Sequence, residues 1–140
     1  MLSQTCKYCT MNHEVTDVMI YICDLTASKL YLYREQSNPG RCVIAYREHA
    51  NELHDLDEKE LAAFASDMKT VGNALRKAFA PKKVNYGMFN DLGDHLHCHI
   101  VPKYEGGYAF GSMFQMNPEP AKLLSDEEYA EIIEKIKANL

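Results

Sequence analysis

Three histidines at alternate positions constrain this chain more than any other feature. His95, His97 and His99 are separated by single apolar residues, and the run continues into Ile100-Val101-Pro102. On a β-strand alternate residues face the same side, so the imidazoles would form one row and the residues between them would face a core. A helix would scatter the rings over more than half of its circumference. We therefore predict a strand that ends near Pro102 or lies at a sheet edge there, because proline cannot donate a ladder hydrogen bond.

A row of imidazoles allows two kinds of chemistry. One is metal ligation. The other is phosphoryl or nucleotidyl transfer, in which one imidazole attacks phosphorus while another carries charge or a proton. Histidine suits the second task because it is nucleophilic when neutral near pH 7, and a protonated neighbour can bind anionic oxygens.

Composition narrows the choice of partner. The chain has 140 residues, 46% of them hydrophobic and 25% charged, which predicts one globular domain over residues 1–140. A net charge of −5 argues against binding to a nucleic-acid polymer, which requires a basic surface, but one local positive site would suffice for a nucleotide. No apolar run reaches the length needed to span a membrane.

The cysteines indicate metal binding rather than disulfides. There are five, an odd number, and Cys6 and Cys9 form a C-x-x-C pair with the spacing of half a zinc site. A redox dithiol is the alternative, but that motif usually follows a strand and nothing before Cys6 is long enough to form one. The N-terminus lacks the features of a signal peptide, so we expect a cytoplasmic protein with reduced thiols. The missing ligands remain open at this point, with His13 as the local candidate and His49, His54 and His95 as the remote ones.

Apolar and aromatic runs bounded by turn residues predict four further strands. The first two should form a hairpin, and the fourth should pair antiparallel with the histidine strand, because only a short turn, Asn90–Asp94, separates them. Asn85 and the turn backbone would then lie beside the imidazole row. The predicted strands span residues 17–23, 29–33, 41–47 and 83–89.

Two helices are expected from apolar periodicity and capping signals. A long helix from Asp57 to about Phe79 begins with a capping box, Asp57 with Glu60, and Pro81 prevents its continuation. A C-terminal helix begins at Ser125 in the same way. The glycine-rich aromatic segment 104–120 predicts an irregular loop. This loop either covers the site or a subunit seam, or merely connects the histidine strand to the last helix.

These motifs together resemble the histidine triad (HIT) superfamily of nucleotide hydrolases and transferases. The histidine run followed by Ile100–Lys103, the Cys6-x-x-Cys9 pair, the segment Arg47–Leu56 and Asn85 match its zinc-bearing bacterial-type pattern. The resemblance implies an α+β fold with a mostly antiparallel five-stranded sheet, one long central helix and a C-terminal helix, in a homodimer.

The resemblance also divides the histidines between two tasks. It implies that His97 attacks the α-phosphorus of a nucleotide conjugate and forms a covalent nucleotidyl-histidine, and that His99 contacts the phosphate oxygens and protonates the leaving group. Asn85 would position the phosphate or the imidazole. The ligands of a structural Zn²⁺ would be Cys6, Cys9, His49 and His95, which leaves no open coordination position.

Some residues depart from the family pattern and keep alternatives open. Asp94 would repel a substrate phosphate unless it points away, Lys103 stands where many members have arginine, and Arg41 follows Pro39-Gly40 where some have histidine. One alternative is a zinc-stabilised nucleotide-binding module with little catalysis. The other is a metalloenzyme that holds one open metal on all three triad histidines.

Overall fold

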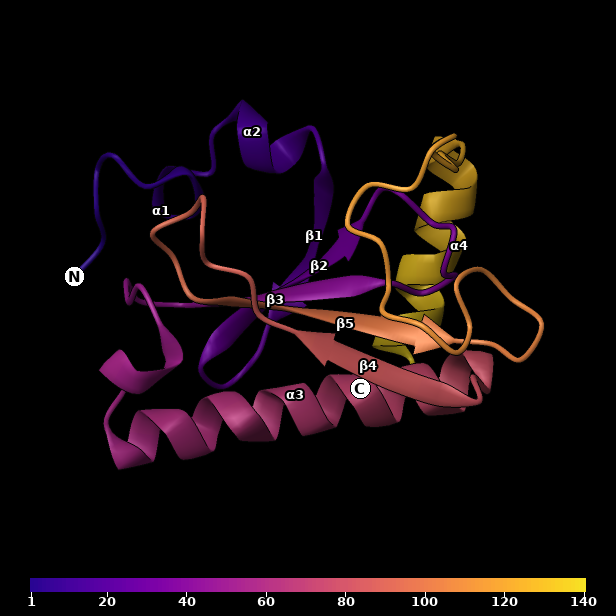
Figure 1. Cartoon of the computed structure of the whole chain (residues 1–140). Coiled ribbons are helices and arrows are strands. Elements are labelled where there is room, and N and C mark those ends of the chain that lie inside the picture. The colour runs from indigo at the N-terminus through magenta and orange to yellow at the C-terminus, as the bar shows by residue number, and fades with distance from the viewer.

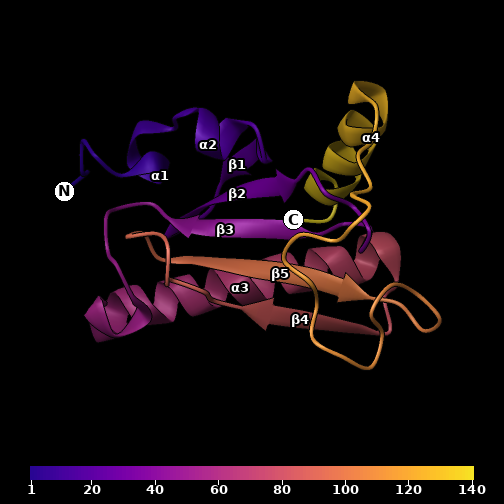
Figure 2. The same ribbon diagram turned by 45° about the horizontal axis from the view of Figure 1, so that its top comes forward.

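The sheet places the histidine strand second from one edge, with a partner strand on each side. The computed structural model describes residues 1–140, and its five strands lie in the order β1-β2-β3-β5-β4 with every neighbouring pair antiparallel. Figures 1 and 2 show α3 running along one side of this sheet, with α4 beside it. The predicted α+β fold is therefore confirmed. The elements are α1 (Lys7–Thr10), α2 (His13–Thr16), β1 (Met19–Asp24), β2 (Ser28–Tyr33), β3 (Cys42–Tyr46), a 3₁₀ turn η1 (Leu53–Asp55), α3 (Glu58–Phe79), β4 (Lys83–Gly87), β5 (His97–Lys103) and α4 (Asp126–Lys137).

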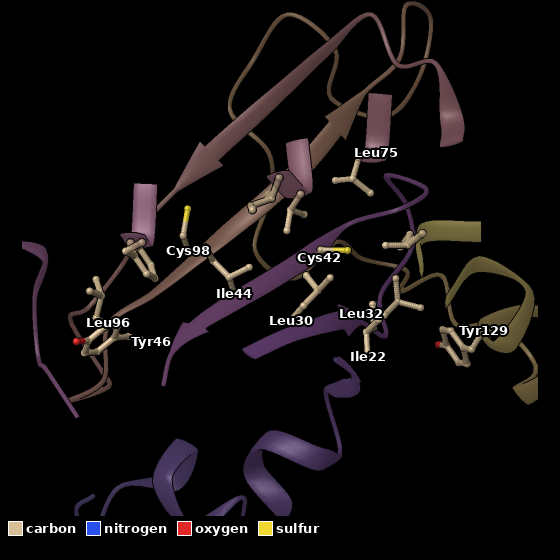
Figure 3. Packing of buried hydrophobic residues seen from close by; sticks show 14 residues of the cluster. Ile22, Leu30, Leu32, Cys42, Ile44, Tyr46, Leu75, Leu96, Cys98 and Tyr129 are labelled. Atoms are coloured by element: carbon tan, nitrogen blue, oxygen red, sulfur yellow. The ribbon is translucent and has the colours of Figure 1, made fainter. Parts of the chain in front are cut away.

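The main core fills the space between the sheet and the two long helices. Alternate residues of β5 and of the strands beside it point to this face, as Figure 3 shows for Ile44 and Cys98. The three apolar residues of the histidine run, Leu96, Cys98 and Ile100, are fully buried here, as the alternation predicts. The opposite face carries the histidines and a second, smaller core around Tyr31 and Val43.

Both predicted helices begin at their capping boxes. The Asp57 side chain accepts from the Glu60 backbone N–H while Glu60 accepts from that of Asp57, and Ser125 and Glu128 repeat the exchange. The helix α3 ends at Phe79, and its C-cap residue Ala80, directly before Pro81, has the left-handed conformation. Neither helix, nor any other in the fold, is both long and apolar enough to cross a membrane.

Strand β5 begins two residues later than predicted, at His97 rather than His95. Before it the chain bends, and the N–H groups of His95 and Leu96 donate to Gly93 and Ala50 instead of a regular ladder. Pairing with β3 stops at Ile100, so Pro102 has a partner strand only on the β4 side. The prediction that the strand ends near Pro102 or lies at a sheet edge there is confirmed, since β5 ends at Lys103.

Candidate active site and metal centre

The three histidines lie on the sheet face away from α3, and all three are buried. The short helix α1 and the loop between β4 and β5 approach this face from one end, side by side in Figure 1. The sequence gives only weak signals for α1 and α2, since each spans four residues, too few for a hydrophobic period to emerge. Their position follows instead from the contacts that Cys6 and Tyr8 make with the sheet.

Cys6, Cys9, His49 and His95 converge on one point. Their ligand atoms all lie within 4.8 Å of one another. The Nδ1 of His95 lies 3.3 Å from the Cys6 Sγ and 3.6 Å from the Cys9 Sγ, and the Nδ1 of His49 lies 3.5 Å from the Cys9 Sγ. A tetrahedral Zn²⁺ with ordinary Zn–S and Zn–N bonds would separate sulfur from nitrogen by about 3.6 Å. The spacing of these donors therefore fits zinc.

The second ring nitrogen of His95 supports the same interpretation. Its Nε2 lies 2.8 Å from the carbonyl oxygen of Tyr46, which can only accept, so Nε2 carries the proton and Nδ1 presents a lone pair to the thiols. Metal-binding histidines usually donate their other N–H to a carboxylate, a backbone carbonyl or water. Burial lowers the pKa of His95, which favours the neutral form that a metal requires.

The other candidate ligands lie elsewhere. His13 is exposed on α2, and His54 is exposed in the 3₁₀ turn beside Glu52. His97 and His99 are not part of the Cys/His cluster. The structure thus gives no support to a metal shared by all three triad histidines.

His97 presents a free nitrogen. Its Nδ1 lies 2.8 Å from the carbonyl oxygen of His95 and must donate to it, which leaves the lone pair on Nε2. The ring of Tyr8 stacks on His97 with centroids 5.2 Å apart, and on His95 at 5.1 Å. Burial lowers the pKa of His97, so the ring is neutral near pH 7 and Nε2 is nucleophilic.

His99 is neutral as well, because a nearby cation adds to the effect of burial. Burial, then the charge of Arg41, then His97 lower its pKa to about 3. The Nη2 of Arg41 lies 3.1 Å from the His99 Nδ1. A guanidinium can only donate, so Nδ1 accepts and the proton of the neutral ring resides on Nε2. At pH 7 this ring offers an N–H donor rather than a positive charge.

A cavity of about 570 Å³ opens beside these two rings. Its walls are mainly apolar, and the charged groups among them are Lys7 and Asp91. Three residues of the segment 113–116 form one wall of the cavity. The glycine-rich loop therefore covers the site, which is one of the alternatives that the sequence leaves open. The lining residues are Lys7, Tyr8, Phe89, Asp91, Leu92, Gly93, His97, His99, Met113, Phe114 and Met116.

Neither Asn85 nor Asp94 lines the histidine cavity. Asn85 pairs with Val101 and lines an adjoining hollow, which shares Met113 with the histidine cavity. Asp94 lines a hollow beside Cys6 and His95 and not the histidine cavity, where Asp91 is the acidic residue instead.

The sequence alone does not reveal the roles of Tyr8 and Arg41. Tyr8 stands between Cys6 and Cys9, whose spacing predicts metal binding, but the sequence gives no signal for a role of Tyr8 itself. Arg41 stands out as a departure after Pro39-Gly40, yet its partner His99 is 58 residues away in sequence, so only the pairing of β3 with β5 brings the two together.

The fold thus brings together a pair of histidines at an apolar cavity and, beside it, a Cys₂His₂ cluster. The HIT domain model matches residues 12–106, and the chain therefore belongs to the HIT family. A curated relative, the adenosine 5′-monophosphoramidase hnt1 of Schizosaccharomyces pombe, is 25% identical over 118 residues, which cover 77% of this chain and 84% of that protein. An uncharacterised HIT-like protein of Mycoplasma genitalium is 32% identical over 77 residues, 51% of this chain and 55% of its own length.

Solved structures show the same fold. The histidine triad protein blr8122 of Bradyrhizobium japonicum superposes with a TM-score of 0.83 at 22% identity, covering 91% of this chain and 95% of that one. A Zn-bound histidine triad family protein of Mycobacterium smegmatis gives a TM-score of 0.68 at 16% identity, covering 96% and 94%.

Proposed function

We propose that this protein hydrolyses, or transfers the nucleotidyl group of, a nucleotide conjugate through a covalent nucleotidyl-histidine at His97. One observation carries the proposal: the Nδ1–H of His97 is engaged by the His95 carbonyl, so the Nε2 lone pair of a neutral ring is free beside the cavity. Membership of the HIT family and the phosphoramidase among its relatives support a nucleotide substrate.

The reaction would proceed in two displacements. The Nε2 of His97 attacks the α-phosphorus, the N–P bond forms, and the bond from phosphorus to the leaving group breaks with its electron pair. Water then attacks the same phosphorus, the N–P bond breaks, and a nucleoside monophosphate departs from the regenerated imidazole. An acceptor in place of water would give nucleotidyl transfer. The candidate substrates are dinucleoside polyphosphates, nucleoside phosphoramidates and acyl-nucleotides.

His99 is assigned to the phosphate oxygens. Its Nε2–H makes no hydrogen bond within the chain, while Nδ1 is occupied by Arg41. A neutral imidazole gives up its remaining proton only reluctantly, so we favour hydrogen-bond donation over proton transfer to the leaving group. Asn85 is proposed to hold a part of the substrate that extends past Met113 into the adjoining hollow.

A structural Zn²⁺ is proposed at Cys6, Cys9, His49 and His95. When bound, it would crosslink the N-terminal segment to the start of β5 and add stability, with no open position for substrate. Tyr8, between the two cysteines, would thereby be held on the His97 ring. We further expect a homodimer in the cytoplasm, with a mass in solution twice the 16.0 kDa of the chain.

Release of nucleoside monophosphate tests the proposal. The zinc-loaded protein should hydrolyse at least one of the three substrate classes, and His97→Ala should abolish turnover without changing the circular dichroism spectrum. His54→Ala, the same substitution at an exposed histidine, is the matched control and should retain full activity. Activity near the parent value in the His97→Ala protein would refute the assignment.

A nucleotide-binding module with little catalysis is the second candidate. The observation in its favour is the carboxylate of Asp91 in the wall of the cavity, which would oppose an incoming phosphate. Calorimetric binding of nucleotides without release of monophosphate from any substrate would favour this candidate over the enzyme.

A further inference from the structure

We propose that Arg41 is a positioning residue that holds His99 as a neutral Nε2–H donor toward the substrate phosphate. The inference rests on the proposed function at His97 and adds a residue to that site. It starts from one contact, the 3.1 Å separation of the Arg41 Nη2 from the His99 Nδ1.

Arg41 is a buried cation at a site built to hold it. Only 1% of its surface is exposed. Its guanidinium carbon lies 4.0 Å from the ring centroid of Tyr33 and 5.3 Å from that of Phe114, and Glu35 Oε2 lies 3.9 Å from its Nη1. Charge and aromatic faces therefore compensate much of the cost of burying an ion.

The local backbone fixes the start of this side chain. Gly40, directly before it, has a φ of +89°, and its N–H donates to the Gln36 Oε1 at 2.8 Å. The Gln36 Nε2 donates in turn to the Arg41 carbonyl oxygen at 3.2 Å. A side chain at Gly40 would be strained and would meet Phe79 at 2.9 Å. The turn therefore holds the Cα of Arg41 in one place.

The same guanidinium also binds the wall of the cavity. Its Nη1 donates to the carbonyl oxygens of Gln115 and Met116 at 3.2 and 3.0 Å. Phe114 and Met116 line the cavity beside His97 and His99. One side chain thus ties the orientation of the His99 ring to the position of the segment that covers the site.

The chemical consequence concerns which nitrogen of His99 is protonated. With Arg41 present, Nδ1 must be the acceptor, and Nε2–H is left to donate to a phosphate oxygen. Without Arg41 the proton is free to move to Nδ1, and Nε2 would present a lone pair to the phosphate and repel it. The groups that face His99 are Arg41 from the turn before β3, Tyr33 from the end of β2, His97 from β5 itself and Phe114 from the loop.

Long-range ¹H–¹⁵N correlation NMR of the zinc-loaded protein at pH 7 tests this without any substrate. The ring of His99, assigned by its loss from the spectrum of His99→Gln, should show an unprotonated Nδ1 and a protonated Nε2. A protonated Nδ1, or an imidazolium at pH 7, would overturn the proposal. If the parent protein hydrolysed no substrate, the proposed function would fail while this NMR result could still hold. Failure of the proposed function and failure of the Arg41 proposal are therefore distinguishable.

Kinetics of Arg41→Lys give the functional readout. Lysine keeps the charge but cannot reach His99 and the two carbonyl oxygens together, so we expect kcat to fall by about 10- to 100-fold with KM changed less than about threefold. In the same variant the His99 signals should show a mixture of tautomers. The matched control is Arg76→Gln, at an exposed arginine on α3. This substitution should change neither kcat nor the His99 tautomer. Parent-like kcat in Arg41→Lys, or a fall in kcat with the His99 tautomer unchanged, would contradict a positioning role.

Discussion

At the scale of single residues, the three histidines differ in which ring nitrogen carries a proton. His95 donates from Nε2 to Tyr46, His97 donates from Nδ1 to the His95 carbonyl, and His99 accepts at Nδ1 from Arg41. Each arrangement suits one task, respectively metal ligation, attack on phosphorus and donation to an oxyanion. The proposed division of labour would therefore follow from three hydrogen-bond partners that the row of histidines itself does not specify.

The low pKa of His99 has a consequence for stability. Its folded pKa, about 3, lies below the value of about 6.5 expected for the unfolded chain. Below pH 6.5 the unfolded state therefore takes up a proton that the folded state does not, and stability falls as the pH falls toward 3. Glutamine at this position cannot titrate. The loss of unfolding free energy caused by His99→Gln should therefore be smaller at pH 5 than at pH 7, by about 2 kcal/mol.

Guanidinium unfolding of both zinc-loaded proteins at the two pH values measures this difference. Comparing the variant with its parent cancels the acid sensitivity of the metal ligands, which both proteins share. An equal loss at pH 5 and pH 7 would mean that His99 titrates alike in the folded and unfolded states, contrary to the buried, arginine-bound ring described above.

At the scale of elements, a single carboxylate joins the β1–β2 hairpin to α3. Asp67, 3% exposed, accepts from the backbone N–H groups of Thr26 and Ala27 at 3.1 and 2.8 Å and from the Ser28 hydroxyl at 2.5 Å. Asp67→Ala leaves these donors without an acceptor, and we expect it to reduce the free energy of unfolding by about 3 kcal/mol.

Chemical denaturation of Asp67→Ala is best compared with that of Glu131→Ala. Glu131 is exposed on α4, and its loss should change stability by less than about 0.5 kcal/mol. An Asp67→Ala protein as stable as this control would show that the hairpin is held by apolar packing alone.

How far the sequence predicts the elements depends on the range of the interactions that stabilise them. The strand alternation around Cys98 and the capping box at Asp57 are local patterns, and both are confirmed. The helices α1 and α2 are too short to show a period, and the bend before His97 depends on a bond from Leu96 to the distant Ala50. The contact of Arg41 with His99 likewise exists only once β3 has paired with β5.

At the scale of the whole molecule, the proposed zinc would tie the N-terminal segment to the residues just after β3 and just before β5. Cys6→Ser should therefore lose zinc and lower the Tm by roughly 10 °C, about 3 kcal/mol for a chain of this size. Cys23→Ser, at a partly buried cysteine of β1 outside the cluster, should keep its metal. Elemental analysis and thermal unfolding give the two readouts.

Chelation separates a structural metal from a catalytic one. For the proposed site, activity and thermal stability should fall together, because Tyr8 leaves the His97 ring when the N-terminal segment is released. Immediate loss of activity with the melting curve unchanged would indicate an open catalytic metal instead. Unchanged zinc content in Cys6→Ser would refute the four-ligand site.

The covalent intermediate is the central claim, and intact-mass spectrometry tests it most directly. The zinc-loaded protein, quenched rapidly without acid after mixing with adenine and guanine nucleotide conjugates, should gain the mass of one nucleotidyl group, and His97→Ala should gain none. The adduct mass would also identify the nucleotide. Two results would contradict covalent catalysis at His97. One is an equal adduct on the parent and on His97→Ala while nucleoside monophosphate is released. The other is turnover retained in His97→Ala.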